Sequence, residues 1–275
     1  MLDPDRLALL VVKPDGVTQH LTRLISLWMR DEGHTLIAFR ELSLIPERRA
    51  RLYASSPEDG RIDGELEAVL YTLGPVHAML FERKTGRAAD GPSAAADVAG
   101  RLVGDPLPHR AGPGTLRGHF GALNPVLNLF HATSDTEHLD RETHALFDRA
   151  VEGFAWPNGG SAHGIGHTPH LLRPFKLWST VAGVLAAWLG PEAVRAIDWP
   201  ADSHGPSSPA VGAALMACTR AAQRAGGEAG ALLTGVLDGS TSYARFCGLV
   251  PDIDPWSGYL TYTTLRHLPL CADTP

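Results

Sequence analysis

Residues Leu7–Val17, LALLVVKPDGV, change from an apolar run to a lysine and a turn. The apolar run predicts a strand at about residues 7 to 13. Only three of the 24 basic residues are lysines. The segment therefore predicts a compact point charge placed directly after a strand.

Residues 128–142 place a histidine just ahead of a predicted helix. Ser134 and Glu137 lie three positions apart and form a capping-box pattern, which predicts that a helix begins there. His131 precedes this start. A helix N-terminus favours an incoming anion, so the position of the histidine suits a phosphate ligand.

Glu142 falls on the apolar face of that helix. It follows Leu139 and precedes Leu146 at spacings of three and four. A carboxylate on that face needs a partner. If the partner is one ring nitrogen of His131, the other nitrogen remains as a nucleophile with a fixed tautomer. In the alternative, His131 only ends a strand and Glu142 meets an arginine.

Several segments resemble the nucleoside diphosphate kinases, in order, across about the first 150 residues. They are LALLVVKPDGV, GPVHAMLFE, GPGTLRGHF, and NLFHATSD followed by ETHALF. The resemblance implies an enzyme that moves the terminal phosphate of ATP to a nucleoside diphosphate through a phosphohistidine. The expected order of strands and helices agrees with an α+β fold, a ferredoxin-like antiparallel sheet with helices.

The resemblance also implies roles for individual residues. His131 is similar to the histidine that takes the phosphate, and Glu142 resembles the glutamate that orients it. Magnesium is expected as a cofactor together with ATP. The residues that match nucleotide or phosphate contacts of the family are Lys13, Tyr53, Arg117, Asn128 and Thr133.

Two of the departures from the family pattern concern the expected nucleotide site. Where the family stacks the base on a phenylalanine, this chain has Asp63 and Gly64. Gly100 and Pro106 fall where the family has a phosphate-binding arginine and threonine. Arg101 lies one residue out of register and is a candidate substitute, since a guanidinium can bind phosphate from more than one direction. The alternative is a surface arginine on a helix.

The composition changes beyond about residue 152, where five of the six tryptophans lie. Helical spacing of apolar residues predicts helices near 177–188, 209–225 and 228–238. The aromatic and threonine content of Trp256–Leu265 instead favours a strand. We therefore expect two parts: residues 1–151 as the kinase-like domain, and residues 152–275 as a mostly helical domain or wrapping extension of unassigned role.

Three histidines lie close together in the second part, within SAHGIGHTPH. His163, His167 and His170 are candidate ligands for zinc or another transition metal, or for phosphate when protonated. The alternative is a glycine-rich loop in which the histidines are incidental. The sequence assigns no metal site to them.

The overall charge bears on the class of partner. A net charge of −6 offers no basic face for nucleic acid. The sequence also shows no secretory signal and no apolar run long enough to span a bilayer. We therefore expect a cytoplasmic protein with a nucleotide and a small-molecule substrate as partners, and no membrane. The resemblance implies a homo-oligomer, a dimer or higher.

Three functions fit the sequence. The first is transfer of phosphate between nucleotides, as the resemblance implies. The second is a repurposed enzyme that phosphorylates a specialised, biosynthetic small metabolite, favoured by the missing aromatic platform and the extra residues. The third is a non-catalytic protein that binds a nucleotide or regulates, although simple binding would not need both His131 and Glu142.

Overall fold

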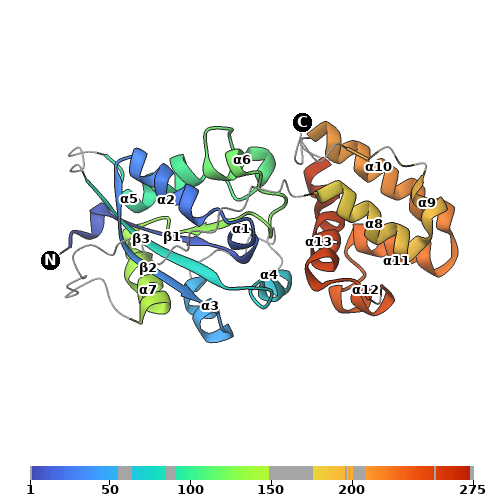
Figure 1. Ribbon diagram of the computed structural model, residues 1–275, viewed down its shortest axis with the longest axis horizontal. Helices are drawn as coiled ribbons and strands as arrows, with labels where there is room; N and C mark the ends of the chain where they lie inside the picture. The colour runs from blue at the N-terminus through green and yellow to red at the C-terminus, as the bar shows by residue number, and fades with distance from the viewer. Residues whose placement is uncertain are drawn as a thin grey trace. The chain divides into compact units, whose positions relative to one another are not determined.

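The computed structural model describes residues 2–54, 64–84, 91–148, 176–195, 197, 199–200, 208–250 and 252–272. These residues form two compact units. In Figure 1 the described residues up to 148 run from blue to yellow-green, and those from 176 onward run from yellow to red. The first unit contains the described residues of Met1–Pro106, Arg110–Phe120 and Asn128–Arg173. The second contains Leu107–His109, Gly121–Leu127 and the described residues of Pro174–Pro275.

The first unit is built on a four-stranded antiparallel sheet with the order β2-β3-β1-β4. The central strand β1 is buried along its whole length, as its apolar sequence predicts. Val11 of β1 pairs with Ala78 of β3 on one side and with His131 of β4 on the other. The strands are β1 (Leu7–Val12), β2 (His34–Leu42), β3 (Val76–Arg83) and β4 (Phe130–Ala132).

Helices cover both faces of this sheet, with α2 and α5 on one side and α3 and α7 on the other (Figure 1). Leu7, Leu9 and Val11 alternate along β1 and pack into one core with Leu139 and Leu146 of α7. The helices and helical turns are η1 (Pro4–Arg6), α1 (Pro14–Thr18), α2 (Thr22–Asp31), α3 (Pro46–Leu52), α4 (Gly64–Leu70), α5 (Ala94–Asp97), the π-helical η2 (Val98–Val103), α6 (Leu116–Phe120) and α7 (Thr136–Phe147).

The N-terminus of α7 differs by one residue from the prediction. Asp135 is the N-cap, and its carboxylate accepts a hydrogen bond from the backbone N–H of His138 at 2.9 Å. Ser134 instead donates to the Asp135 carboxylate at 3.1 Å. The predicted capping box of Ser134 and Glu137 is therefore wrong, because the adjacent aspartate supplies an equally good acceptor.

The described residues of the C-terminal part, from 176 to 272, are mostly helical, as predicted. α13 packs against α8, α10, α11 and α12, and Asn124 donates to Thr263 of α13 at 3.4 Å. The helices with residues in the second unit are η3 (Pro108–Arg110), α8 (Leu177–Leu189), α9 (Pro191–Arg195), α10 (Ser208–Ala225), α11 (Gly227–Asp238), α12 (Tyr243–Leu249) and α13 (Pro255–Ala272).

The predicted strand at Trp256–Leu265 is wrong, because these residues belong to α13. Tyr259, Tyr262 and Leu265 are all buried. The hydroxyl of Thr263 donates to the carbonyl of Tyr259 one turn earlier at 2.9 Å, so the polar group is satisfied within the helix. Burial against several helices has overridden the strand propensity of aromatic and β-branched residues.

In the described ranges, none of the helices combines the length and the apolar character that crossing a membrane requires.

The four-stranded antiparallel sheet with its covering helices confirms the predicted α+β class of the first unit. The short strand β4 brings His131 beside the end of β1, where Lys13 follows. The fold thus joins two chemically informative segments that lie more than one hundred residues apart in the sequence.

Candidate active site

The turn after β1 fixes the backbone just ahead of His131. The N–H of Lys13 donates to the carbonyl of Leu129 at 2.9 Å, and the Asp15 carboxylate accepts from the N–H of Leu129 at 2.9 Å. Leu129 has φ +71°, a conformation that residues other than glycine adopt at a cost. A side chain at Gly16 would press on the Leu129 carbonyl, 3.1 Å from the position of its Cβ. The KPDG turn therefore holds a strained connection in place.

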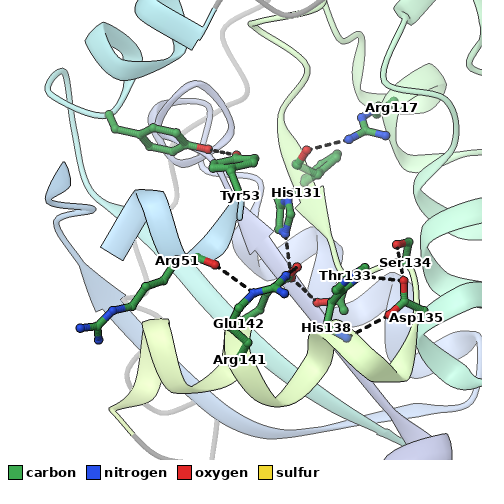
Figure 2. A network of polar contacts seen from close by, with 12 residues as sticks. Arg51, Tyr53, Arg117, His131, Thr133, Ser134, Asp135, His138, Arg141 and Glu142 are labelled. Atoms are coloured by element: carbon green, nitrogen blue, oxygen red, sulfur yellow. Dashed lines mark hydrogen bonds and ion pairs between the residues drawn. The ribbon is translucent and has the colours of Figure 1, made fainter. Parts of the chain in front are cut away.

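His131 and Glu142 make the contact that the helical spacing suggested. Nε2 of His131 lies 2.9 Å from Oε2 of Glu142, and the hydroxyl of Thr133 donates to the same oxygen at 2.7 Å (Figure 2). A guanidinium nitrogen of Arg141 lies 3.5 Å from the second carboxylate oxygen. Glu142 is buried. The carboxylate engages Nε2, so Nδ1 is the ring nitrogen suited to attack a ligand.

Tyr53 packs against the other side of this histidine. Its ring meets the His131 ring edge to face, with centroids 5.0 Å apart, and its hydroxyl shares a short hydrogen bond with the hydroxyl of Tyr71. Burial raises the pKa of both tyrosines well above the usual value, and the negative charge of Glu67 adds to the effect. Both hydroxyl groups therefore stay protonated at neutral pH.

Lys13 is almost completely buried and is paired with an acid. Its Nζ lies 3.0 Å from Oε1 of Glu67 and 3.3 Å from Oδ1 of Asn128. Glu67 belongs to α4 and is buried as well. The sequence analysis did not single out Glu67. The usable signal was its place beside Leu66 and three residues before Leu70, the same kind of apolar spacing that identified Glu142.

Arg117 bonds to the backbone that leads to His131. Its Nε donates to the carbonyl of Asn128 at 3.1 Å, and one terminal nitrogen donates to the carbonyl of Phe130 at 2.7 Å. The other terminal nitrogen makes a short hydrogen bond to the carbonyl of Gly104. Burial lowers the pKa of Arg117 to about 10. The guanidinium thus links Gly104, which follows η2, to the residues on both sides of the strained Leu129.

Arg101 has different surroundings. In the part of the chain that the structure describes, its ion pairs go to Asp97 at 2.8 Å and to Glu32 at 2.9 Å. The side chain is 55% exposed, and the hydrogen bonds that it donates to Asp97 are the main cause that raises its pKa above the usual value. These contacts favour the alternative of a surface arginine over a substitute for the missing phosphate ligand.

Some predicted positions lie outside the described residues. These are Asp63, at the place of the missing aromatic platform, and the three histidines His163, His167 and His170. Within the residues that are described, no three histidine, cysteine, aspartate or glutamate side chains come together as a group that could hold a metal ion. The site gathered by the fold therefore consists of His131, Glu142, Thr133, Tyr53, Lys13, Asn128 and Arg117, with Glu67 and Tyr71 added.

Comparison with known proteins gives a consistent result. The nucleoside diphosphate kinase family model matches residues 7–151. The nucleoside diphosphate kinase of Ignicoccus hospitalis is 36% identical over 146 residues, which cover 52% of this chain and 91% of that protein. The enzyme of Bacillus thuringiensis subsp. konkukian is 31% identical over 138 residues, covering 50% of this chain and 85% of that protein.

A crystal structure of the Aquifex aeolicus nucleoside diphosphate kinase is 22% identical, covers 51% of this chain and 93% of that chain, and superposes with a TM-score of 0.43. The family model covers more than half of the sequence, from β1 to just beyond α7. The chain belongs to the nucleoside diphosphate kinase family.

Proposed function

We propose that this protein is a kinase in which His131 takes the terminal phosphate of magnesium-bound ATP and passes it to a nucleoside diphosphate. The relatives are named nucleoside diphosphate kinases, which supports the reaction class. The observation that carries the proposal is the contact of Nε2 of His131 with the buried carboxylate of Glu142 at 2.9 Å. A histidine held in this way suits covalent catalysis.

In the first half of the reaction, the lone pair on Nδ1 of His131 attacks the terminal phosphorus of ATP. The bond from that phosphorus to the bridging oxygen breaks, and ADP leaves with the electron pair. The imidazole ring becomes positively charged, and Glu142 stabilises that charge across the 2.9 Å contact. In the second half, an oxygen of the acceptor attacks the same phosphorus and releases the neutral ring.

The remaining residues support these steps. Thr133 donates to Glu142 and keeps its oxygen directed at the ring. Lys13 supplies a cation for phosphate oxygens, and the Tyr53 hydroxyl can donate a hydrogen bond beside the ring. Arg117 acts through its bonds to the carbonyls of Asn128 and Phe130, which hold the strand of His131.

Magnesium belongs to the substrate in this scheme, because its preferred ligands are the phosphate oxygens of ATP and water. Among the residues that the structure describes, no group of side chains offers a metal site of its own. The protein's task is then to receive the charge of the nucleotide with Lys13 and to present Nδ1 of His131.

The direct test is to incubate the protein with terminally labelled ATP. We expect label on the protein that is lost in acid and kept in base, as for a phosphohistidine, and that His131→Ala abolishes. His138→Ala is the matched control, because this histidine also lies beside an acid, Asp135, with nitrogen and oxygen 2.7 Å apart. A wild-type protein that takes up no label would refute the proposal.

A second candidate is transfer to a specialised small metabolite in place of a nucleoside diphosphate. The ion pair of Lys13 with Glu67 favours it, because this pair places an acid within the expected phosphate site. A panel of acceptors separates the two candidates. Similar rates on several nucleoside diphosphates support the first, and failure on all of them while His131 is still labelled supports the second.

A further inference from the structure

The charge of Lys13 is already balanced inside the protein. Its Nζ lies 3.0 Å from Oε1 of Glu67, and the two side chains are 1% and 10% exposed. Because the pair is shielded from water, both charges act at closer to full strength than a pair on the surface would.

Glu67 also influences the hydroxyl groups beside His131. Its negative charge contributes to the raised pKa of Tyr53 and of Tyr71, after the larger effect of burial. Tyr53 in turn contacts the ring of His131. The acid therefore stands next to Lys13 and to the tyrosine pair, which are the groups that a phosphate at His131 would approach.

A phosphate that binds Lys13 must come close to Glu67 as well. Attraction to the ammonium and repulsion from the carboxylate act over similar distances, so much of the attraction is cancelled. The repulsion grows with the charge on the ligand. A heavily charged diphosphate is therefore penalised more than a phosphate monoester, and an uncharged ligand is not penalised at all.

We infer that Glu67 is a specificity-determining residue, which weakens the binding of phosphorylated ligands at Lys13 in proportion to their negative charge. The site then favours an acceptor that is less charged than a nucleoside diphosphate, such as a phosphate monoester. This inference rests on the phosphohistidine step of the proposed function and favours its second candidate, transfer to a small metabolite, because it concerns the acceptor of the phosphate. It assigns a role to a residue of α4 that the matching motifs do not include.

The experiment is a binding titration at fixed magnesium concentration with ADP, AMP and adenosine as probes. For the wild type we expect ADP to bind no more than about threefold more tightly than AMP. In Glu67→Gln we expect ADP to bind about tenfold more tightly than in the wild type, AMP about threefold, and adenosine without change. The matched control is Glu65→Gln, which removes an exposed acid from the same helix and should change none of the three.

A second substitution tests whether the effect depends on the ion pair. Lys13→Met removes the cation that would hold a phosphate beside Glu67, so the phosphate is no longer kept close to that carboxylate. Adding Glu67→Gln to Lys13→Met should then change ADP binding less than about twofold. If Glu67→Gln strengthened ADP binding by the same factor in the wild type and in Lys13→Met, the inference would be overturned.

Other outcomes also overturn it. They are weaker ADP binding in Glu67→Gln, an equal gain for adenosine, the same gain in Glu65→Gln, and a wild type that binds ADP more than about tenfold more tightly than AMP. The ratio of ADP affinity to AMP affinity is measured on the wild-type protein, so it remains decisive if Glu67→Gln folds poorly. Binding requires no transfer, so an unlabelled His131 would contradict the proposed function alone, and unchanged binding in Glu67→Gln would contradict this inference alone.

Discussion

The residues around His131 and the residues around Arg101 both contain paired charges, but their environments differ. Glu142 is buried and takes hydrogen bonds from Thr133 and the histidine ring. Arg101 is half exposed and pairs with acids on the surface. Buried charges must be individually satisfied, whereas exposed pairs contribute little. The difference suggests that the residues proposed for phosphate transfer are held by buried hydrogen bonds, whereas the contacts of Arg101 are those of a surface arginine.

The largest effect is expected for Arg117→Ala. The change removes the Arg117 donor from the carbonyls of Gly104 and Phe130, whereas the carbonyl of Asn128 still accepts from the N–H of Phe130 at 2.9 Å. We expect the free energy of unfolding to fall by about 4 kcal/mol, since each buried acceptor left unsatisfied costs about 1 to 3 kcal/mol. Urea unfolding measures this loss. The exposed Arg23→Ala is the control, and an equally small change in both would show that Arg117 does not hold the strand of His131.

Glu142→Gln tests whether the negative charge of this buried side chain, and not only its shape, matters for the reaction of His131. The amide keeps the size of the side chain but cannot stabilise a positively charged ring. We expect the rate of labelling of His131 to fall about 100-fold, with the fold retained. Rapid-quench labelling measures the rate, and Glu137→Gln on the exposed face of α7 is the control. A rate within about twofold of the wild type would remove Glu142 from the mechanism.

Thr133→Val tests the second hydrogen bond to the same carboxylate. Valine has nearly the shape of threonine but lacks the hydroxyl that donates to Glu142 at 2.7 Å. We expect labelling to slow about tenfold, because a hydrogen bond to a charged group contributes about 1.5 to 3 kcal/mol. Thr133→Ser keeps the hydroxyl and should stay close to the wild type. If serine is as slow as valine, packing of the methyl group is responsible instead.

The smallest effect is expected for Arg101→Ala, which changes the exposed group of charges in the comparison. Its pairs with Asp97 and Glu32 lie at the surface, so we expect labelling to change less than about twofold and the free energy of unfolding by about 0.5 kcal/mol. A loss of labelling greater than about tenfold would mean that Arg101 binds phosphate, and the comparison would fail.

The pH dependence of the free energy of unfolding also tests whether Arg101 forms a surface ion pair with Asp97. The hydrogen bond from Arg101 is the main cause that lowers the pKa of Asp97 below its ordinary value. A lowered carboxyl pKa stabilises the folded protein above the unfolded value of about 3.9 and loses this contribution as the pH falls through the lower folded value. The stability gap between wild type and Arg101→Ala should therefore shrink below about pH 4 in thermal unfolding. A gap that stays constant down to pH 3 would contradict this assignment.

Much of the first unit could be predicted from the sequence because its signals are local. The apolar run of β1 and the spacing of Glu142 on α7 each follow from a single short segment. Glu67 has a similar spacing on α4, but its partner Lys13 is more than fifty residues away, and nothing local indicates which charge would meet it. Such a pair becomes visible only when the fold brings two segments together.

The errors have related causes. Ser134 and Asp135 are both good caps, and the choice between them depends on the backbone geometry at the end of β4. The residues of α13 have the composition of a strand, but contacts with several helices decide their structure. The ion pairs of Arg101, whose role stays a prediction, could not be foreseen from register either, because its acidic partner Glu32 lies at the distant end of another helix.

The central claim is that Glu142 occupies Nε2 of His131 and leaves Nδ1 to take the phosphate. Phosphorus NMR of the protein after reaction with ATP tests it most directly, because the two isomers of phosphohistidine give separate signals. We predict a single signal from Nδ1-phosphohistidine that is absent in His131→Ala. A signal from the Nε2 isomer, or phosphate on another residue, would contradict the account.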